Sequence, residues 1–495
     1  MTRRPTSSRP TRDLSALFDP RGVIVTGVSS HPGKFGFVCL HNLLAAGYRG
    51  EIFPVGREPG EVLGREVLGS IDEVPAGRAD MVFVCTPPSL NEDLLRAAAA
   101  KGVRAAFIAA AGYREAGPDG IDAERSLVAA ADELGIVLAG PNGQGVVSTP
   151  SSMCAQIVAP YAPAGNIAVV SQSGNFVSSL LNMAHLSGVG ISRAVSAGNA
   201  AQLGVADYLE WFAQDPETAV SLVYMESVDD GRVMFERLRA VSSAKPIVLV
   251  KGGASTAGAQ AAASHTGALA TDDAVFDGMC RQAGVIRARD PEEAFEAAAS
   301  LATQPLPSGN RVVVVTTVGG WGVAAVDAMA GTLLDPIPLP EDLRTEIDKL
   351  LPPRWSRGNP IDMAGGETRD TVPEILEMVA GHSEVDAVLF LGLGIQSNVA
   401  AMMRGGPFFP DHSLRRIVDF HETQDTRYAQ AATAVAERTS TPVLVATELA
   451  NTRPDTPGPA TMRAAGQMCH ASAGRAVRSL DLMVRHARWR SARGI

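Results

Sequence analysis

The residues Asn166-Ile-Ala-Val-Val-Ser171 form a continuous apolar run, which Gln-Ser-Gly-Asn175 and a helical pattern to about Leu186 follow. The same order of strand, small-residue turn and helix begins again at Val23–Gly27 and at Arg311–Thr317. Continuous apolar strands are typical of parallel sheets that are buried on both faces. Strands that alternate with helices indicate doubly wound α/β domains. The sequence therefore predicts an α/β protein with three such blocks.

The rest of the chain fits this architecture. At about 100–200 residues per domain, 495 residues suggest about three domains. Two Pro-containing stretches, Ser148–Pro163 and Gln304–Asn310, precede fresh strands and are interpreted as linkers. We expect residues 1–13 to be a disordered basic tail and residues 471–495 to form a basic helix with a solvated face, with a subunit contact as the alternative. Further strands are predicted at Met81–Cys85, Ala105–Ala109, Gly135–Ala139, Val220–Met225, Ile247–Lys251, Val385–Leu391 and Pro442–Ala446.

Composition excludes several classes of protein. The net charge is −10 and aromatic residues make up 5%, so the chain offers neither a basic field nor many stacking platforms for nucleic acid. The five cysteines are far apart, which indicates no disulfide framework and no metal site. No stretch approaches the ~20 apolar residues of a membrane helix, and the N-terminus lacks the apolar region of a secretory signal. We expect a cytoplasmic protein without a membrane partner.

The turn Gly27–Gly36 is a candidate for binding phosphate, because backbone N–H groups at a helix start favour an anion. It is not a dinucleotide fingerprint, since Ser29 stands where the second glycine would be. The alternative is a tight strand-to-helix turn. Two later turns follow buried strands, at Thr86-Pro-Pro88 and Gly140-Pro-Asn-Gly-Gln-Gly145. Ligands bind at such sheet edges, although an interdomain turn explains the second turn better when that segment is considered alone.

Ser171-Gln-Ser-Gly174 gathers hydroxyl and free N–H groups at the start of a helix. This arrangement suits a phosphate or phosphoryl group, but Ser173 is equally well interpreted as an ordinary N-cap. Thr316-Thr-Val-Gly-Gly-Trp-Gly322 repeats the pattern and offers a second helix start.

His265 lies in the stretch Lys251–Ala270, which has almost no large side chains and is expected to be mobile. A lone histidine is usually structural or solvated, but an imidazole on a mobile arm is also able to carry a phosphoryl group. Glu226 follows the predicted strand Val220–Met225 and is a candidate to orient that imidazole. The alternative for Glu226 is a solvated acid at a strand end.

The order of these motifs resembles the NDP-forming acyl-CoA synthetase superfamily, which includes the α subunits of ADP-forming acetyl-CoA synthetase and of succinyl-CoA synthetase. The resemblance covers roughly Leu14 to Thr447. Its most specific part is Ser264-His-Thr-Gly-Ala-Leu269, which looks like the family's phosphohistidine loop. The other matches, in family order, are Gly140-Pro-Asn142, Ser171-Gln-Ser-Gly174, Gly198-Asn199 and Asn359-Pro-Ile-Asp362.

The resemblance implies a Rossmann-like CoA-binding domain at 14–148, a flavodoxin-like ligase domain with the phosphohistidine loop at 160–303, and a second flavodoxin-like ligase domain at 310–465. His265 would be the phosphorylated residue and Glu226 its carboxylate partner. The residues that would bind CoA are Gly27, Ser29, Pro32, Lys34, Pro87 and Asn142. Those that would bind the phosphoryl group are Ser171, Gln172, Ser173 and Gly174, opposed by Gly319 and Gly320.

The reaction implied is acyl-CoA + phosphate + ADP ⇌ carboxylate + CoA + ATP, through an acyl phosphate and phosphohistidine, with a small carboxylic acid or its acyl-CoA as substrate. After three α/β blocks too little chain is left for the family's ATP-grasp domain. We therefore expect an α-type subunit of a hetero-oligomer, with ATP or ADP and Mg²⁺ on an ATP-grasp partner.

Two positions depart from the family pattern: Thr317 replaces an asparagine, and Gln202 stands where an aspartate is usual. The alternative function is a non-catalytic CoA- or acyl-CoA-binding protein of the same fold, against which the intact His265 loop argues. A nicotinamide-dependent oxidoreductase is disfavoured because the dinucleotide glycines are missing.

Overall fold

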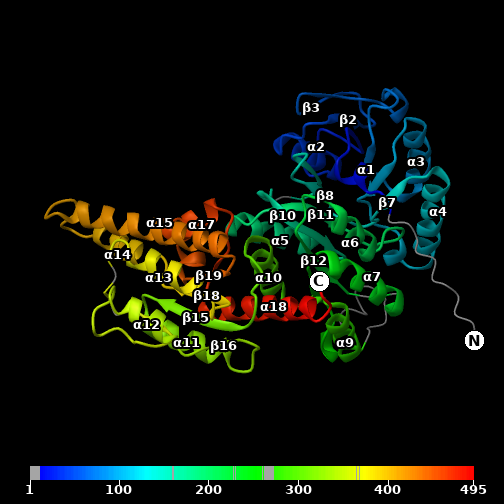
Figure 1. Cartoon of the computed structure of the whole chain (residues 1–495). Helices are drawn as coiled ribbons and strands as arrows, with labels where there is room; N and C mark the ends of the chain where they lie inside the picture. The colour runs from blue at the N-terminus through cyan, green and yellow to red at the C-terminus, as the bar shows by residue number, and fades with distance from the viewer. Residues whose placement is uncertain are drawn as a thin grey trace, which may run out of the picture. The chain divides into compact units, whose positions relative to one another are not determined.

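The protein is described from a computed structural model, which covers residues 12–158, 161–226, 228, 230–258, 260, 272–363, 365–366 and 368–495. The chain divides into two compact units (Figure 1). The first contains the residues up to Asn182 together with Gly190–Arg287, and the second contains Met183–Val189 and Ala288–Ile495. Most of the predicted 1–13 tail and the His265 loop lie outside the described residues. Among the helices that are described, none is both long and apolar enough to cross a lipid bilayer.

The first sheet of unit 1 is parallel and has the order β2-β1-β5-β6-β7. Its central strands are apolar and fully buried, as the sequence predicted for a sheet covered on both faces. The chain passes from β1 to β2 on one side and then to β5 on the other, which makes a crevice at the carboxyl ends of β1 and β5. The elements are α1 (Ser15–Phe18), β1 (Gly22–Thr26), α2 (Phe35–Ala45), β2 (Glu51–Val55), the hairpin β3 (Gly60–Val62) and β4 (Arg65–Val67), β5 (Met81–Val84), α3 (Asn91–Ala100), β6 (Ala105–Ile108), α4 (Pro118–Leu134) and β7 (Val137–Ala139).

The second sheet of unit 1 has the order β14-β13-β12-β10-β11-β8-β9, and its first five strands are parallel. The chain adds β11 on one side of β10 and then β12 on the other side. The carboxyl ends of β10 and β12 therefore flank the crevice of this sheet. The elements are β8 (Gly145–Ser148), β9 (Met153–Gln156), β10 (Ala164–Ser171), α5 (Gly174–Ser187), β11 (Ile191–Ser196), α6 (Val205–Gln214), β12 (Val220–Met225), α7 (Gly231–Ala244), β13 (Ile247–Lys251), α9 (Asp273–Ala283) and β14 (Ile286–Arg287).

The prediction of a linker at Ser148–Pro163 is wrong for the first half of this stretch, which forms part of a β-hairpin. Strands β8 and β9 form an antiparallel hairpin that pairs with β11 and extends the second sheet. All four residues of β9 are buried, so this segment is part of the core rather than a solvated connection. The second expected linker is a loop, since α10 ends at Thr303 and β15 begins at Arg311.

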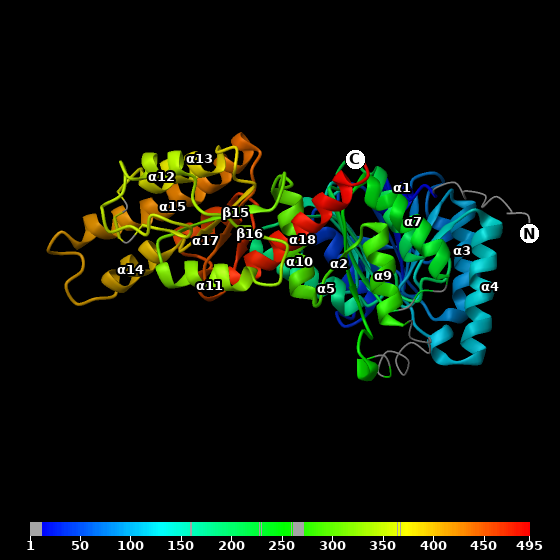
Figure 2. The same ribbon diagram turned by 60° about the horizontal axis from the view of Figure 1, so that its bottom comes forward.

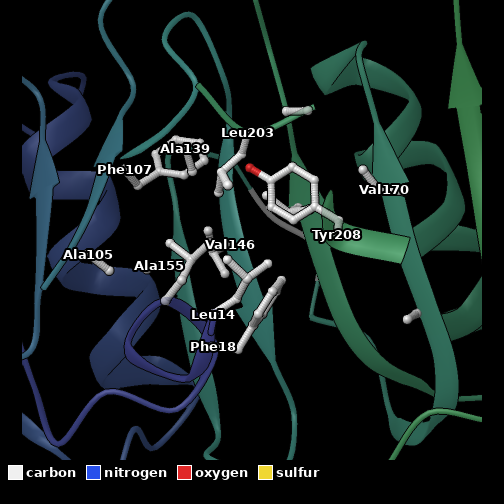
Figure 3. Packing of buried hydrophobic residues seen from close by; sticks show 14 of the residues in the cluster. Leu14, Phe18, Ala105, Phe107, Ala139, Val146, Ala155, Val170, Leu203 and Tyr208 are labelled. Carbon is white, nitrogen blue, oxygen red and sulfur yellow. The ribbon is translucent and has the colours of Figure 1, made fainter. Parts of the chain in front are cut away.

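The two sheets of unit 1 share one hydrophobic core (Figure 3). Leu14 and Phe18 from the region of α1 belong to the same buried cluster as Phe107 of the first sheet and Val146 of the second. Arg193 of β11 is buried at the same junction, where its guanidinium pairs with Asp19 at 2.6 Å and with Asp215 at 3.0 Å. The apolar core and the Arg193–Asp19 ion pair therefore hold the region of α1 and the second sheet together in one unit.

The sheet of unit 2 is parallel, with the order β16-β15-β18-β19-β20, and β17 pairs with the end of β15. The order in which the chain adds strands to this sheet reverses between β15 and β18. The elements are α10 (Pro291–Thr303), β15 (Arg311–Thr316), α11 (Gly319–Met329), β16 (Asp335–Pro336), α12 (Glu341–Ile347), β17 (Ile361–Asp362), α13 (Thr371–Ala380), β18 (Ala387–Leu391), α14 (Ile395–Arg404), α15 (Leu414–Thr439), β19 (Val443–Ala446), α16 (Leu449–Thr452), α17 (Pro457–Ala464), β20 (Cys469–His470) and α18 (Ala473–Ser491).

Helix α18 is the basic C-terminal helix that the sequence predicted: Arg485 and Arg488 are exposed on one face, while the other face is apolar and buried. Leu480, Met483 and Val484 are fully buried against the sheet, and the helix packs beside α10 (Figure 2). Strand β20 pairs with β19 just before it. The third block therefore continues past the predicted end at residue 465, because its sheet and core need both elements.

Candidate active site

The loop after β1 is folded tightly and leaves the start of α2 open. Gly27 has a φ of +70°, and a Cβ at Gly36 would lie 2.4 Å from the Gly27 carbonyl oxygen. Close packing at both glycines thus bends the chain sharply into α2. Pro32 and Lys34 are exposed at this helix start. Ser29 lies in the same loop, and its hydroxyl accepts a long hydrogen bond from the His31 N–H at 3.4 Å.

The structure brings the other predicted CoA residues to the same sheet edge. A Cβ at Gly27 would lie 2.9 Å from the Cys85 carbonyl oxygen, so this loop contacts the end of β5. Pro87 is exposed two residues further on. Asn142 follows β7 with a φ of +58°, and its N–H donates to the Ala110 carbonyl oxygen beyond β6 at 3.1 Å. The carboxyl edge of the first sheet therefore carries the whole predicted set.

The hydroxyl of Ser171 shapes the turn that ends β10. It donates to the Ser173 carbonyl oxygen at 2.6 Å and accepts from the Ser173 N–H at 3.1 Å, and the side chain is buried. Helix α5 then begins at Gly174, which is partly exposed like Ser173. Ser171 therefore acts by folding the turn, while Ser173 and Gly174 present the helix start to solvent.

Glu226 lies directly beside this turn, because β10 and β12 flank the crevice of the second sheet. The Gln172 side-chain oxygen accepts from the Glu226 N–H at 2.6 Å, and the Gln172 N–H donates to the Tyr224 carbonyl oxygen at 3.1 Å. The Tyr224 hydroxyl donates to the Glu226 carboxylate at 3.2 Å, and Phe176 stacks on the Tyr224 ring. Burial raises the pKa of Tyr224 to about 12, and the negative charge of Glu226 adds to the rise.

The chain that leads toward His265 passes this carboxylate. A Cβ at Gly252 would lie 2.7 Å from the Tyr224 hydroxyl oxygen and 3.2 Å from Cγ of Glu226. Only glycine allows the backbone after β13 to run this close to Tyr224. His265 itself lies outside the described residues.

The sheet of unit 2 repeats the same turn. Thr316 is buried at the end of β15, and its hydroxyl donates to the Val318 carbonyl oxygen and accepts from the Val318 N–H, both at 2.9 Å. Helix α11 then begins at Gly319, three residues after the hydroxyl, as α5 begins three residues after Ser171. A Cβ at Gly319 would lie 2.2 Å from an Asp362 carboxylate oxygen, whereas a Cβ at Gly320 would meet nothing within 4 Å.

Asn359 extends the ladder beside β15. Its side-chain oxygen accepts from the Val314 N–H at 2.9 Å, and its nitrogen donates to the carbonyl oxygens of Val312 and Ile337 at 2.8 and 2.9 Å. The amide thus fills the gap between β16 and β17. The motif Asn359-Pro-Ile-Asp362 therefore fixes Asp362 against the start of α11.

Comparisons with known proteins agree with this arrangement. Family models match residues 21–149 as a CoA binding domain, 164–301 as a succinyl-CoA ligase like flavodoxin domain and 312–395 as a Ligase-CoA domain. The α subunit of acetate–CoA ligase [ADP-forming] I from Pyrococcus furiosus is 37% identical over 382 residues, which cover 76% of this chain and 82% of the relative. The chain belongs to the NDP-forming acyl-CoA synthetase family.

Two further relatives of this family are informative. The dinucleotide forming acetyl-coenzyme A synthetase 1 of Ca. Korarchaeum cryptofilum, solved with phosphate and ADP, matches with a TM-score of 0.82 at 28% identity and covers 97% of this chain and 98% of that one. Acetate–CoA ligase [ADP-forming] I of Archaeoglobus fulgidus is 35% identical, over 76% of this chain but only 54% of the relative. The family therefore also includes longer chains.

The structure shows the contacts of Gln202 and Thr317, the two residues that depart from the family pattern. The Gln202 side-chain oxygen accepts from the Leu138 N–H at 2.8 Å, and its nitrogen donates to Asp132 at 2.7 Å, so it joins the two sheets of unit 1. Thr317 contacts the turn after β18, where a Cβ at Gly392 would lie 2.2 Å from its hydroxyl oxygen. In this member of the NDP-forming acyl-CoA synthetase family, Gln202 thus anchors the first sheet on the second.

Proposed function

We propose that this chain is the α-type subunit of an acid–CoA ligase that interconverts acyl-CoA, phosphate and ADP with carboxylate, CoA and ATP. The observation that carries the proposal is the junction of Ser171–Gly174 with Glu226. There, one glutamine side chain fixes the backbone of a carboxylate beside an open helix start. A helix start that stabilises an anion, next to a carboxylate able to orient an imidazole, is what phosphohistidine chemistry needs.

In the proposal, CoA binds along the carboxyl edge of the first sheet. The open start of α2 and the exposed Lys34 suit its phosphates. Pro87 and Asn142 extend the same edge toward the second sheet, in the direction of the proposed phosphate site. The thioester of a bound acyl-CoA thus lies within reach of that site.

The first chemical step is attack by a phosphate oxygen on the thioester carbonyl carbon. The carbon–sulfur bond breaks, CoA leaves as its thiolate, and an acyl phosphate forms. The Gly174 N–H and the Ser173 hydroxyl hold the phosphate and stabilise its charge, because the Ser173 N–H already donates to the Ser171 hydroxyl.

The second step transfers the phosphoryl group to His265. A ring nitrogen attacks phosphorus, the bond from phosphorus to the acyl oxygen breaks, and the carboxylate is released. Glu226 accepts a hydrogen bond from the other ring nitrogen and so keeps the attacking nitrogen unprotonated. Tyr224 holds the carboxylate, while Gln172 holds its backbone.

The nucleotide step is proposed to take place on an ATP-grasp partner. Among the described residues there is no group of three or more His, Cys, Asp or Glu side chains that could hold a metal ion. In the proposal, the Mg²⁺ that accompanies ADP is held with the nucleotide on the partner, and no step of this chain is routed through it.

Isotope labelling tests the carrier. Acetyl-CoA and ³²P-phosphate are expected to give the chain an acid-labile, alkali-stable label, because a phosphoimidazole has this stability. His265→Ala should abolish the label without changing CoA affinity, since the carrier acts after CoA has bound. Glu226→Gln should slow labelling without abolishing it. The control is His185→Ala, which removes an exposed histidine near the end of α5 and should label normally.

Labelling of the His265→Ala chain at the wild-type rate would contradict the proposal. If the wild-type chain binds CoA but takes no label even with its partner and ATP, the non-catalytic CoA-binding alternative is favoured.

A further inference from the structure

Gln144 lies in the turn at residues 140–145, between the two sheets of unit 1. Its backbone is fixed, because its carbonyl oxygen accepts from the Ile157 N–H at 2.9 Å. The neighbouring Gly143 has no room for a side chain, since a Cβ there would lie 2.6 Å from the Ser196 carbonyl oxygen. The turn is also held by the Asn199 N–H, which donates to the Pro141 carbonyl oxygen at 2.9 Å. Gln144 therefore projects from a rigid support.

The side chain of Gln144 lies over the first turns of α5. Its nitrogen donates to the Asn175 side-chain oxygen at 3.0 Å, and its oxygen accepts from the Ser178 hydroxyl at 2.9 Å. A Cβ at Gly174 would lie 2.4 Å from Cγ of Gln144, so the two residues pack directly together. One amide thus contacts three residues at the helix start that the proposed function gives to phosphate.

Both ends of this contact are parts of the proposed site. The turn carries Asn142, a predicted CoA contact, two residues before Gln144. The helix start carries Ser173 and Gly174. Within the turn, Gly143 leaves the chain little freedom between Asn142 and Gln144. A displacement of the turn is therefore transmitted to α5 through the amide.

We infer that Gln144 is a positioning residue, which sets the first turn of α5 relative to the turn that carries Asn142 and thereby aligns phosphate with bound acyl-CoA. The inference rests on the proposed function. Gln144 does not need to touch either substrate, because it acts through Asn175 and Ser178.

Gln144→Leu keeps much of the side-chain volume and removes both hydrogen bonds. In phosphate-dependent release of CoA from acetyl-CoA, we expect it to raise the KM for phosphate about tenfold, the effect of losing two neutral hydrogen bonds. The KM for acetyl-CoA should stay within about twofold, because the groups that contact CoA are unchanged. A residue with a merely structural role would impair both substrates together.

Ser178→Ala should act in the same direction but more weakly, since it removes one of the two bonds. In the double variant, Ser178→Ala should not raise the KM for phosphate beyond the value of Gln144→Leu alone, because Gln144→Leu has already removed the hydrogen bond that the two residues share. Ser179→Ala is the matched control: this neighbouring hydroxyl donates to the Asn175 carbonyl oxygen of its own helix, at 3.1 Å, and among the described residues it makes no hydrogen bond to Gln144. We expect wild-type constants for Ser179→Ala.

Binding provides a readout independent of turnover. In thermal unfolding, inorganic phosphate should raise the midpoint of the wild-type chain much more than that of Gln144→Leu, whereas CoA should stabilise both equally. Equal phosphate shifts, parallel changes in both KM values, or additive effects with Ser178→Ala would overturn the inference. A wild-type chain that binds phosphate and CoA without turnover would contradict the proposed function alone, and the binding arm would still decide the role of Gln144.

Discussion

At the scale of single residues, the first sheet and the sheet of unit 2 contain the same arginine–aspartate ion pair, which we call a clamp. Arg21 precedes β1, and Asp80 precedes β5. The Arg21 N–H and Nε donate to one Asp80 carboxylate oxygen and Nη2 donates to the other, at 2.7–2.9 Å. Arg311 and Asp386 make the same three contacts before β18, at 2.9–3.0 Å. Each of these ion pairs joins the two strands that flank a crevice, at their amino ends, opposite to the site. The ion pair thus helps to fix the spacing of the two strands.

Asp80→Asn is expected to destabilise unit 1 by about 1.5–3 kcal/mol, the usual worth of hydrogen bonds to a charged group. The Arg21 contact lowers the pKa of Asp80 from 3.8 to about 2. Because the folded pKa is depressed, the contribution is complete above pH 4 and is lost as pH falls through 4 toward 2. Urea unfolding of both proteins at pH 7 and pH 3 measures this.

The control for Asp80→Asn is Glu51→Gln, which breaks the exposed pair of Glu51 with Arg78 and should cost under about 1 kcal/mol. A difference between wild type and Asp80→Asn that stays constant from pH 7 to pH 3 would contradict the assigned role of the carboxylate.

At the scale of elements, the second and third blocks build their helix starts alike. A strand ends in a buried hydroxyl residue, Ser171 or Thr316, whose side chain closes the turn, and the helix starts three residues later. The hydroxyl satisfies backbone groups that would otherwise remain unpaired at the sheet edge. Its role is therefore to hold the helix start in position.

The two glycines at the start of α11 should respond differently to alanine. Gly319→Ala places a Cβ against the Asp362 carboxylate and is expected to destabilise unit 2 by about 1–3 kcal/mol. Gly320→Ala has open space and should be neutral, or stabilising by up to about 1 kcal/mol as a better helix former. Denaturant unfolding checks both, and equal costs would show that Asp362 does not restrict the helix start.

Strands and motif order were predictable from the sequence, whereas the polar contacts that join elements were not. The apolar run before Ser171 and the small residues after it indicated the strand, turn and helix without any tertiary information. Gln144 reaches a helix that begins 30 positions later, and Asn359 completes a ladder 45 positions earlier. Both side chains lie in motifs that the sequence singled out, but their partners follow no periodicity, so sequence reasoning missed the contacts. The strand β9 was likewise hidden, because a four-residue buried strand in a Pro-containing stretch has the composition of a linker.

At the scale of the whole molecule, each of the three sheets carries candidate site residues at the carboxyl ends of its strands. In each sheet they lie next to the point where the order of strand addition reverses. In the proposal, the first edge suits CoA and the second suits phosphate and the histidine carrier, while the third carries a helix start of the same construction as the second. The relative from Pyrococcus furiosus, of which this chain covers 82%, is itself named a subunit α. We propose that the nucleotide step takes place on a second polypeptide.

The chain alone should therefore convert acetyl-CoA and phosphate into acetyl phosphate and CoA, but should form no ATP from added ADP. The acyl-transfer step needs only the sheet edges present here, whereas the phosphoryl group on His265 needs a nucleotide site to receive it. Adding a co-expressed ATP-grasp polypeptide should restore ATP synthesis, measured by luciferase, and His265→Ala should abolish it while leaving acetyl phosphate formation intact. This variant is the decisive control, because it separates the carrier from the first step. ATP formation by the purified single chain at the rate of the mixture would show that the nucleotide site lies within these residues and that no partner is required.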